Sequence, residues 1–139
     1  MKIQSFSWKS KISFFCLVAS FFQISMAWAG LAVICHPSKK GTFSQDDVKS
    51  MYSGRKQSGT LVDQSSSAVR GDFYQKLLGK TDAQMKAIWN EIIFAGGAAP
   101  RVEKDDNAVV QYVSEHEDAV GYVNSDKADA SKVAVLFNL

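Results

Sequence analysis

The segment that decides how this chain folds is Asp63-Gln64-Ser65-Ser66-Ser67-Ala68-Val69-Arg70-Gly71-Asp72-Phe73. It follows a short apolar run, Thr60 to Val62, that is typical of a strand. It opens a helical pattern of apolar residues that ends at Gly79. The sequence therefore predicts that a strand gives way to a helix N-terminus at the three serines.

This junction has the residue types of an anion site. The first turn of a helix carries unpaired N–H groups and a partial positive charge, so it readily accepts an anion. Ser65, Ser66 and Ser67 add hydroxyls, and Arg70 in the first turn could add a bidentate contact to an oxyanion. Serines before a helix also serve simply as N-caps, so the segment alone leaves both interpretations open.

The first 29 residues have the features of a secretory signal peptide. Lys2, Lys9 and Lys11 form a positive start, residues 12–26 are mostly apolar, and Ala27-Trp28-Ala29 has the small-x-small pattern of a cleavage site. We expect cleavage after Ala29 rather than a retained membrane anchor, because the apolar stretch is short for a bilayer span. The mature protein, residues 30–139, is then periplasmic or secreted if the signal is bacterial.

Charge and cysteine content exclude several classes for residues 30–139. Removing three of the 16 basic residues with the signal leaves 13 against 14 acidic ones, a net charge of −1. A near-neutral domain without a basic run gives no support for nucleic-acid binding. Cys35 is the one cysteine left, which excludes an intramolecular disulfide. The length suits one small domain.

The remaining elements follow from periodicity and caps. Strands are expected at 31–35, 60–62, 119–123 and 133–137, and residues 98–103 are expected to be loop. Further helices are expected to start at Ser44, at Thr81 and at Asp105 or Asp106, the first two with capping-box partners Asp47 and Gln84. Strands alternating with helices predict an α/β fold: a single domain with a mainly parallel sheet flanked by helices.

Such a sheet predicts where a ligand binds. Ligands of open α/β sheets lie beyond the carboxyl ends of the strands. The loops after the first two strands carry Ser38 and the three serines, so we expect both loops at the same edge. The candidate oxyanion ligands are therefore Ser38, Ser65, Ser66, Ser67 and Arg70.

Four stretches resemble one family, the phosphate-binding proteins of phosphate ABC transporters. The similar stretches are Thr42–Arg55, Phe73–Gly79, Trp89–Gly97 and Asp118–Val123. In the family's phosphate loop a serine precedes the helix, where Ser67 stands here, and Arg70 could replace the arginine that the family carries at the strand end. The resemblance implies one lobe of a type 2 periplasmic-binding-protein-like fold.

The resemblance also implies a function. It implies a periplasmic solute-binding-like protein that holds phosphate or a related oxyanion in phosphate uptake or sensing, with a membrane transporter or sensor as partner. With one lobe the anion stays partly in water, where charge contacts weaken, unless a second copy supplies the other wall as a homodimer. The alternative is an accessory protein that keeps the fold but has lost the ligand.

Other chemistry finds little support in the sequence. Cys35, His36 and His116 are too few soft or imidazole ligands for a tetrahedral metal site, so no metal and no cofactor is expected. No recognisable set of nucleophile, base and orienting residue is present, and we expect no enzyme activity.

Overall fold

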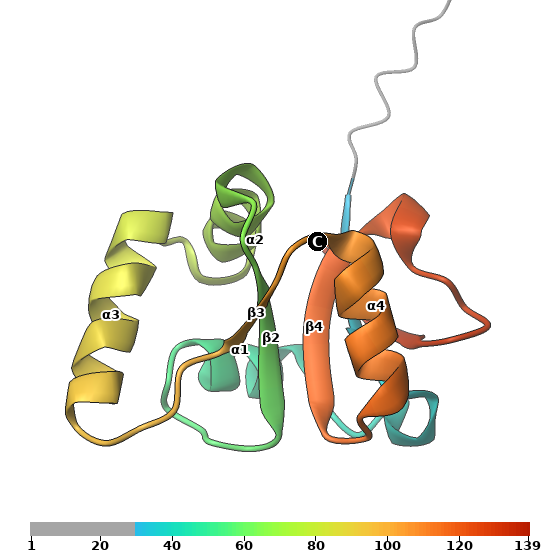
Figure 1. Ribbon diagram of the computed structural model, residues 1–139, viewed down its shortest axis with the longest axis horizontal. Helices are drawn as coiled ribbons and strands as arrows, with labels where there is room; N and C mark the ends of the chain where they lie inside the picture. The colour runs from blue at the N-terminus through green and yellow to red at the C-terminus, as the bar shows by residue number, and fades with distance from the viewer. Residues whose placement is uncertain (1–29) are drawn as a thin grey trace, which may run out of the picture.

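The structure, a computed structural model, describes residues 30–139 and consists of one sheet with helices on both faces (Figure 1). The expected signal peptide lies outside the described residues. In chain order the elements are β1 (Leu31–Cys35), the short 3-10 helix η1 (Pro37–Lys39), α1 (Gln45–Tyr52), β2 (Thr60–Gln64), α2 (Ser67–Leu78), α3 (Asp82–Phe94), β3 (Arg101–Glu103), α4 (Asp106–Glu115), β4 (Ala119–Asn124), the 3-10 helix η2 (Ser125–Lys127) and β5 (Ala134–Asn138).

The sheet is mixed, with one reversed strand. Its spatial order is β3-β2-β4-β1-β5. β2 pairs in parallel with both β3 and β4, whereas β1 pairs antiparallel with β4 and with β5. Every strand except β1 therefore points the same way, which confirms the α/β fold with a mainly parallel sheet.

Two details of the expected sheet are wrong. Residues 101–103 form the edge strand β3 rather than loop, paired through Val62↔Arg101 to Gln64↔Glu103. β1 is buried on both faces as expected, but it runs antiparallel to β4 instead of parallel. Burial on both faces indicates a central strand, but it does not tell whether that strand runs parallel or antiparallel to its neighbours.

The two faces of the sheet have separate apolar cores. One face packs against α1, α2 and α3, with Tyr52, Phe73, Tyr74 and Tyr122 among its largest buried side chains. The other face packs against α4 through Val109, Val110 and Val113. Gly121 of β4 allows this close approach, because a Cβ there would lie 2.8 Å from Cγ1 of Val109. The sheet is thus covered by three helices on one face and one on the other.

Helix starts match the predicted caps. The capping boxes Ser44/Asp47 and Thr81/Gln84 are both formed, and Asp105 accepts the N–H of Ala108 at the start of α4. α2 ends at Gly79, whose φ of 65° is the left-handed conformation that glycine adopts without strain. These local signals fix where α1, α3 and α4 begin and where α2 ends.

Candidate functional site

The N-terminus of α2 is built differently from those of the other helices. Ser66 is the N-cap residue in an extended conformation, but its side chain makes no capping hydrogen bond. The first turn contains no acidic residue, whereas α1, α3 and α4 each carry at least one and are each capped by a side chain. The first-turn N–H groups of α2 are thus left without a side-chain acceptor.

The three serines differ in their surroundings. Ser65 is hydrogen-bonded to the end of β3. Its N–H donates to the Glu103 carbonyl at 2.9 Å, and its hydroxyl donates to the carbonyl of Lys104, the next residue, at 3.1 Å. Ser66 is half-buried, and Ser67, the first residue of α2, is exposed. The backbone of Ser65 is therefore held in place, while Ser67 faces solvent.

Arg70 lies in the first turn of α2, as expected, and it is already paired. Its Nε and one terminal nitrogen donate to the two carboxylate oxygens of Asp82, at 2.5 and 2.9 Å. Its other terminal nitrogen donates to the Gln64 carbonyl at 2.9 Å, at the end of β2. The side chains of Arg70 and Asp82 are 13% and 21% exposed.

This pairing stabilises both charges. The hydrogen bonds to Asp82 raise the pKa of Arg70 further, and the bonds from Arg70 lower the pKa of Asp82. A guanidinium has five N–H donors, and three of those in Arg70 are used, so two remain for another acceptor. The orientation of the Arg70 side chain is thus fixed, and its positive charge is partly neutralised by Asp82.

A buried carboxylate lies beside this pair. Asp63 is 6% exposed and accepts hydrogen bonds from the hydroxyls of Tyr74, at 2.6 Å, and of Tyr122, and from the Gln64 N–H. Burial, and next the charge of Asp63, raise the pKa of Tyr74 and that of Tyr122. Both phenols therefore stay protonated and serve as donors that hold the carboxylate inside the core.

Ser38 does not join this site. It is exposed and hydrogen-bonds His36, with 2.7 Å between the Ser38 hydroxyl and Nδ1. Cys35 at the end of β1 pairs with Val120, near the start of β4, and Leu61 near the start of β2 also pairs with Val120. The loop after β1 therefore lies at the opposite edge from Ser65, and the expectation of a shared edge is wrong because β1 is reversed.

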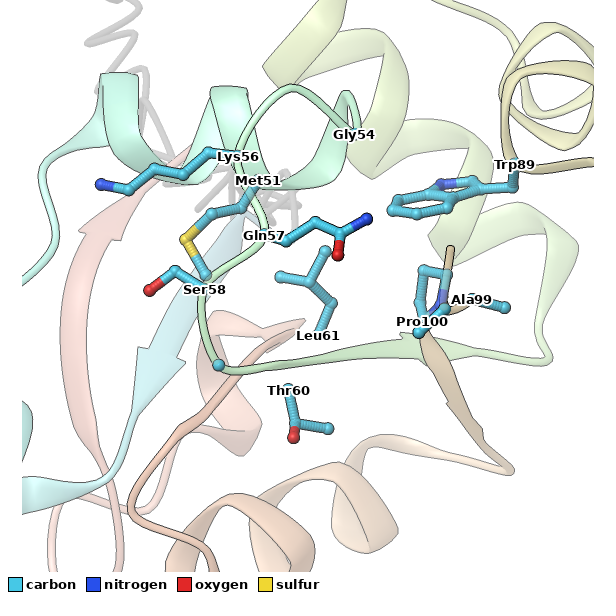
Figure 2. A pocket seen from close by; sticks show the side chains of 12 residues that line it. Met51, Gly54, Lys56, Gln57, Ser58, Thr60, Leu61, Trp89, Ala99 and Pro100 are labelled. Carbon is cyan, nitrogen blue, oxygen red and sulfur yellow. The ribbon is translucent and has the colours of Figure 1, made fainter. Parts of the chain in front are cut away.

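Two hollows share Trp89 in their lining. The first, of about 150 Å³, is formed by the loop after α1, the start of β2 and the segment Ala98–Pro100. Figure 2 shows the Trp89 ring and Pro100 on one side of it and Met51 and Ser58 on the other. The second, of about 190 Å³, contains Arg70 and Asp82 in its lining. Trp89 lines both hollows, of which the first contains one charged side chain, Lys56, and the second contains four.

Several residues near the site were not predicted. Asp82 and Lys86 begin α3 next to Arg70, and Asp82 is half-buried because Arg70 lies against it. The short turn between α2 and α3 makes the two helices neighbours, but which side chain of α3 meets Arg70 depends on how the helices pack. Trp89 was expected in a core stripe, and it is buried there.

Metal binding and membrane insertion have no structural feature behind them in the described part of the chain. Among residues 30–139, no three His, Cys, Asp or Glu side chains gather as a metal site would require. None of the helices between Gly30 and Leu139 has the length and apolar character to cross a bilayer. Cys35 is buried, and burial raises the pKa of its thiol.

The fold is that of an α/β domain whose sheet has one reversed strand, and solved structures share it. The chain is similar to an ABC-type phosphate transport receptor from Vibrio cholerae, with a TM-score of 0.55 and 18% identity. It is also similar to a protein from Clostridium perfringens that is assigned as a phosphate ABC transporter substrate-binding protein and contains bound phosphate. This match has a TM-score of 0.56 and 18% identity. A possible phosphate-binding protein from Planctomyces limnophilus matches with a TM-score of 0.55 and 16% identity.

These matches cover one part of each larger protein. Each covers 77% of this chain but only 45%, 44% and 40% of the respective solved chains. The chain thus spans less than half the length of the structures it matches, in agreement with the single lobe that the resemblance implied. No protein-family model and no curated protein matches the chain. At 16–18% identity the likeness shows the fold.

Proposed function

We propose that this chain is an exported solute-binding-type protein that receives phosphate or a related oxyanion at the N-terminus of α2. Ser66, Ser67 and the first-turn N–H groups of α2 are the donors, with the two remaining N–H groups of Arg70 beside them. The chain is cleaved after Ala29, works in the periplasm without enzyme activity, and passes its ligand or signal to a membrane transporter or sensor.

One observation carries the proposal. α2 begins without a side-chain cap and without an acidic residue, while a half-buried arginine lies in the same turn. Uncapped N–H groups and a helix dipole favour an anion there, and charge-assisted bonds from a guanidinium are stronger than neutral ones. The fold shared with phosphate-transport proteins supports the same ligand class.

The surroundings set a modest affinity. Asp82 neutralises much of the Arg70 charge, and Asp63 adds a negative charge behind it. Ser67 is exposed, so a bound anion keeps part of its contact with water. We therefore expect dissociation constants of roughly 0.1 to 10 mM, set by the helix N–H groups more than by net charge.

The test is a thermal-unfolding series on residues 30–139 with phosphate, sulfate and chloride at matched ionic strength. A ligand that binds only the folded state raises the melting temperature as its concentration passes the dissociation constant. Ser67→Pro removes one N–H and one hydroxyl, yet proline suits the first position of a helix. We expect a phosphate-selective rise that is lost in Ser67→Pro.

Arg55→Ala is the matched control, because Arg55 is exposed and its side chain makes no ion pair in the described residues. It removes a positive charge without touching α2, so the phosphate response should persist. Equal responses to phosphate and chloride in the native protein, or a Ser67→Pro response equal to the native one, would refute binding at α2.

The second candidate function is that of an accessory protein without a ligand. Phe94 at the end of α3 is 96% exposed, although a phenylalanine gains free energy by burial. A single exposed apolar residue is common on protein surfaces, so this observation is the weaker one. Under this function no anion raises the melting temperature, and Phe94→Ser abolishes binding of the partner.

A further inference from the structure

The hollow beside Arg70 has an unusual combination of charges. It lies between α2, α3 and the segment before β3, with a volume of about 190 Å³. Its lining includes two acidic and two basic side chains, namely Asp63, Asp82, Arg70 and Lys86. The lining is thus neutral overall but carries both signs of charge at close range.

These charged groups are connected yet not saturated. Lys86 Nζ lies 3.4 Å from Asp82 Oδ2, and Arg70 donates to both oxygens of Asp82. Each carboxylate offers about four acceptor sites. Asp63 uses three of them, and Lys86 and Arg70 both keep N–H donors. A small molecule that enters the hollow meets free donors and free acceptors together.

The rest of the lining is mostly apolar, with Tyr74 and Asn90 as the polar exceptions. Its apolar members are Met85, Trp89, Ala99, Pro100 and Val102. Trp89 is nine-tenths buried, and its indole N–H has no hydrogen-bond acceptor. The Tyr74 hydroxyl lies close to this N–H but outside hydrogen-bond geometry. Buried polar groups are rarely left without a partner, and each such case needs an explanation.

We propose that this hollow is a second binding site, for a small zwitterion of amino-acid size with a compact apolar body. The ammonium group pairs with Asp63 and Asp82, and the carboxylate pairs with Arg70 and Lys86. The apolar body lies against Met85, Pro100 and Val102. This site goes beyond the oxyanion proposed for α2 and shares only Arg70 with it.

Charge decides between ligand classes. A phosphate ion placed here would meet Arg70 and Lys86, but also two carboxylates that repel it and an apolar wall that does not replace its lost hydration. A purely apolar molecule would dehydrate the charged groups and would give no partner to the donors and acceptors that remain free. A zwitterion supplies one partner of each sign, so it offsets the desolvation of both.

Trp89 reports on this site directly, because it is the sole tryptophan of residues 30–139. The experiment follows its fluorescence while L-alanine, L-leucine or L-phenylalanine is added to the mature protein. Isocaproate and isoamylamine serve as matched probes, since each resembles leucine without its ammonium or its carboxylate. We expect a saturable change with at least one amino acid and at least a tenfold weaker response to both probes.

Two alanines allow a matched pair of variants. Ala99 lines the charged hollow and is exposed, so Ala99→Phe fills the hollow without disturbing the core. Ala98 lines only the neighbouring recess, so Ala98→Phe is the control. Ala99→Phe should abolish the response and Ala98→Phe should keep it. Circular dichroism verifies that both variants are folded.

The result also separates this site from the one at α2. Ser67→Pro should leave the amino-acid response unchanged, whatever its effect on phosphate, and Ala99→Phe should leave any phosphate response unchanged. No saturable response to the three amino acids, an equal response to isocaproate, or an unaffected Ala99→Phe would each overturn the zwitterion site. None of these outcomes bears on phosphate binding at α2.

Discussion

The guanidinium of Arg70 and the carboxylate of Asp82 form a bidentate ion pair that joins the first turn of α2 to the first turn of α3. Each residue lies at a helix start, where an acid complements the helix dipole and a base does not. Asp82 therefore suits its own helix and also compensates the charge of Arg70. Because the pair is only 13–21% exposed, it both orients Arg70 and limits the charge offered to an anion.

Replacing Asp82 by asparagine should strengthen oxyanion binding while it weakens the fold. Asp82→Asn keeps a hydrogen-bond acceptor but removes the negative charge, so Arg70 presents its full charge at α2. We expect phosphate affinity to rise three- to tenfold and stability to fall by about 1–3 kcal/mol. Calorimetric titration with phosphate and denaturant unfolding measure the two effects.

The matched control is Asp72→Asn. Asp72 pairs with Lys76 one turn later on the surface of α2, with 47% of its side chain exposed. An exposed pair of this kind contributes about 0.3–0.5 kcal/mol, so neither stability nor phosphate affinity should change much. Equal phosphate affinities in native protein and Asp82→Asn would mean that Arg70 is purely a structural partner.

The same pair predicts an acid dependence of stability. Hydrogen bonds from Arg70 hold the pKa of Asp82 below its usual value in the folded state. A carboxyl with a lowered folded pKa contributes stability above its unfolded pKa of about 3.9, and the contribution is lost as the pH falls through the folded value. The stability difference between native protein and Asp82→Asn should therefore shrink from about pH 6 to about pH 2. A constant difference would contradict the lowered pKa.

Local parts of the fold were predictable because the signals that specify them are local. The capping boxes at Ser44 and Thr81 each need two residues three positions apart, and both form. The strand from Leu31 to Cys35 has the predicted bounds because its apolar run is uninterrupted. The direction of that strand depends on pairings with residues about 90 positions away, which no local pattern encodes.

The edge strand β3, the partner of Arg70 and the hollow around Trp89 were not predictable, because their sequence signals are too short or depend on long-range packing. β3 has three residues, two of them charged, so it lacks both the length and the alternation that identify a strand. The serines and Arg70 were correctly placed at the start of a helix. The partner of Arg70 was missed because an acid at a helix start is fully explained as a dipole partner. The hollow around Trp89 depends on packing between three elements.

The buried carboxylate of Asp63 predicts a stability cost for removing its donors. Tyr74→Phe keeps the ring but leaves one oxygen of Asp63 without its hydrogen bond at 2.6 Å. A buried charged acceptor that loses a donor costs about 1–3 kcal/mol, measured by denaturant unfolding. Tyr112→Phe is the control, since Tyr112 is half-buried and its hydroxyl makes no hydrogen bond in the described residues. Similar losses in the two variants would show that Asp63 does not depend on Tyr74.

Two glycines should respond in opposite ways to alanine. Gly121→Ala places a Cβ 2.8 Å from Val109 and 3.3 Å from Val62, so overpacking between β4 and α4 should cost about 1–3 kcal/mol. Gly71 lies inside α2 with open space around its Cβ position, and Gly71→Ala should gain about 0.5–1 kcal/mol from helix propensity. A melting temperature that rises in Gly121→Ala would contradict the packing described for α4.

The central claim is that phosphate binds at the N-terminus of α2, and an amide NMR titration tests it most directly. ¹⁵N-labelled residues 30–139 are titrated with phosphate and, in a parallel sample, with chloride at matched ionic strength. We predict saturable shifts of the Ser67, Ala68 and Val69 amides with phosphate alone, since these N–H groups would donate to the anion. Unchanged amides at these three positions up to tens of millimolar phosphate, or shifts of the same size with chloride, would contradict the claim.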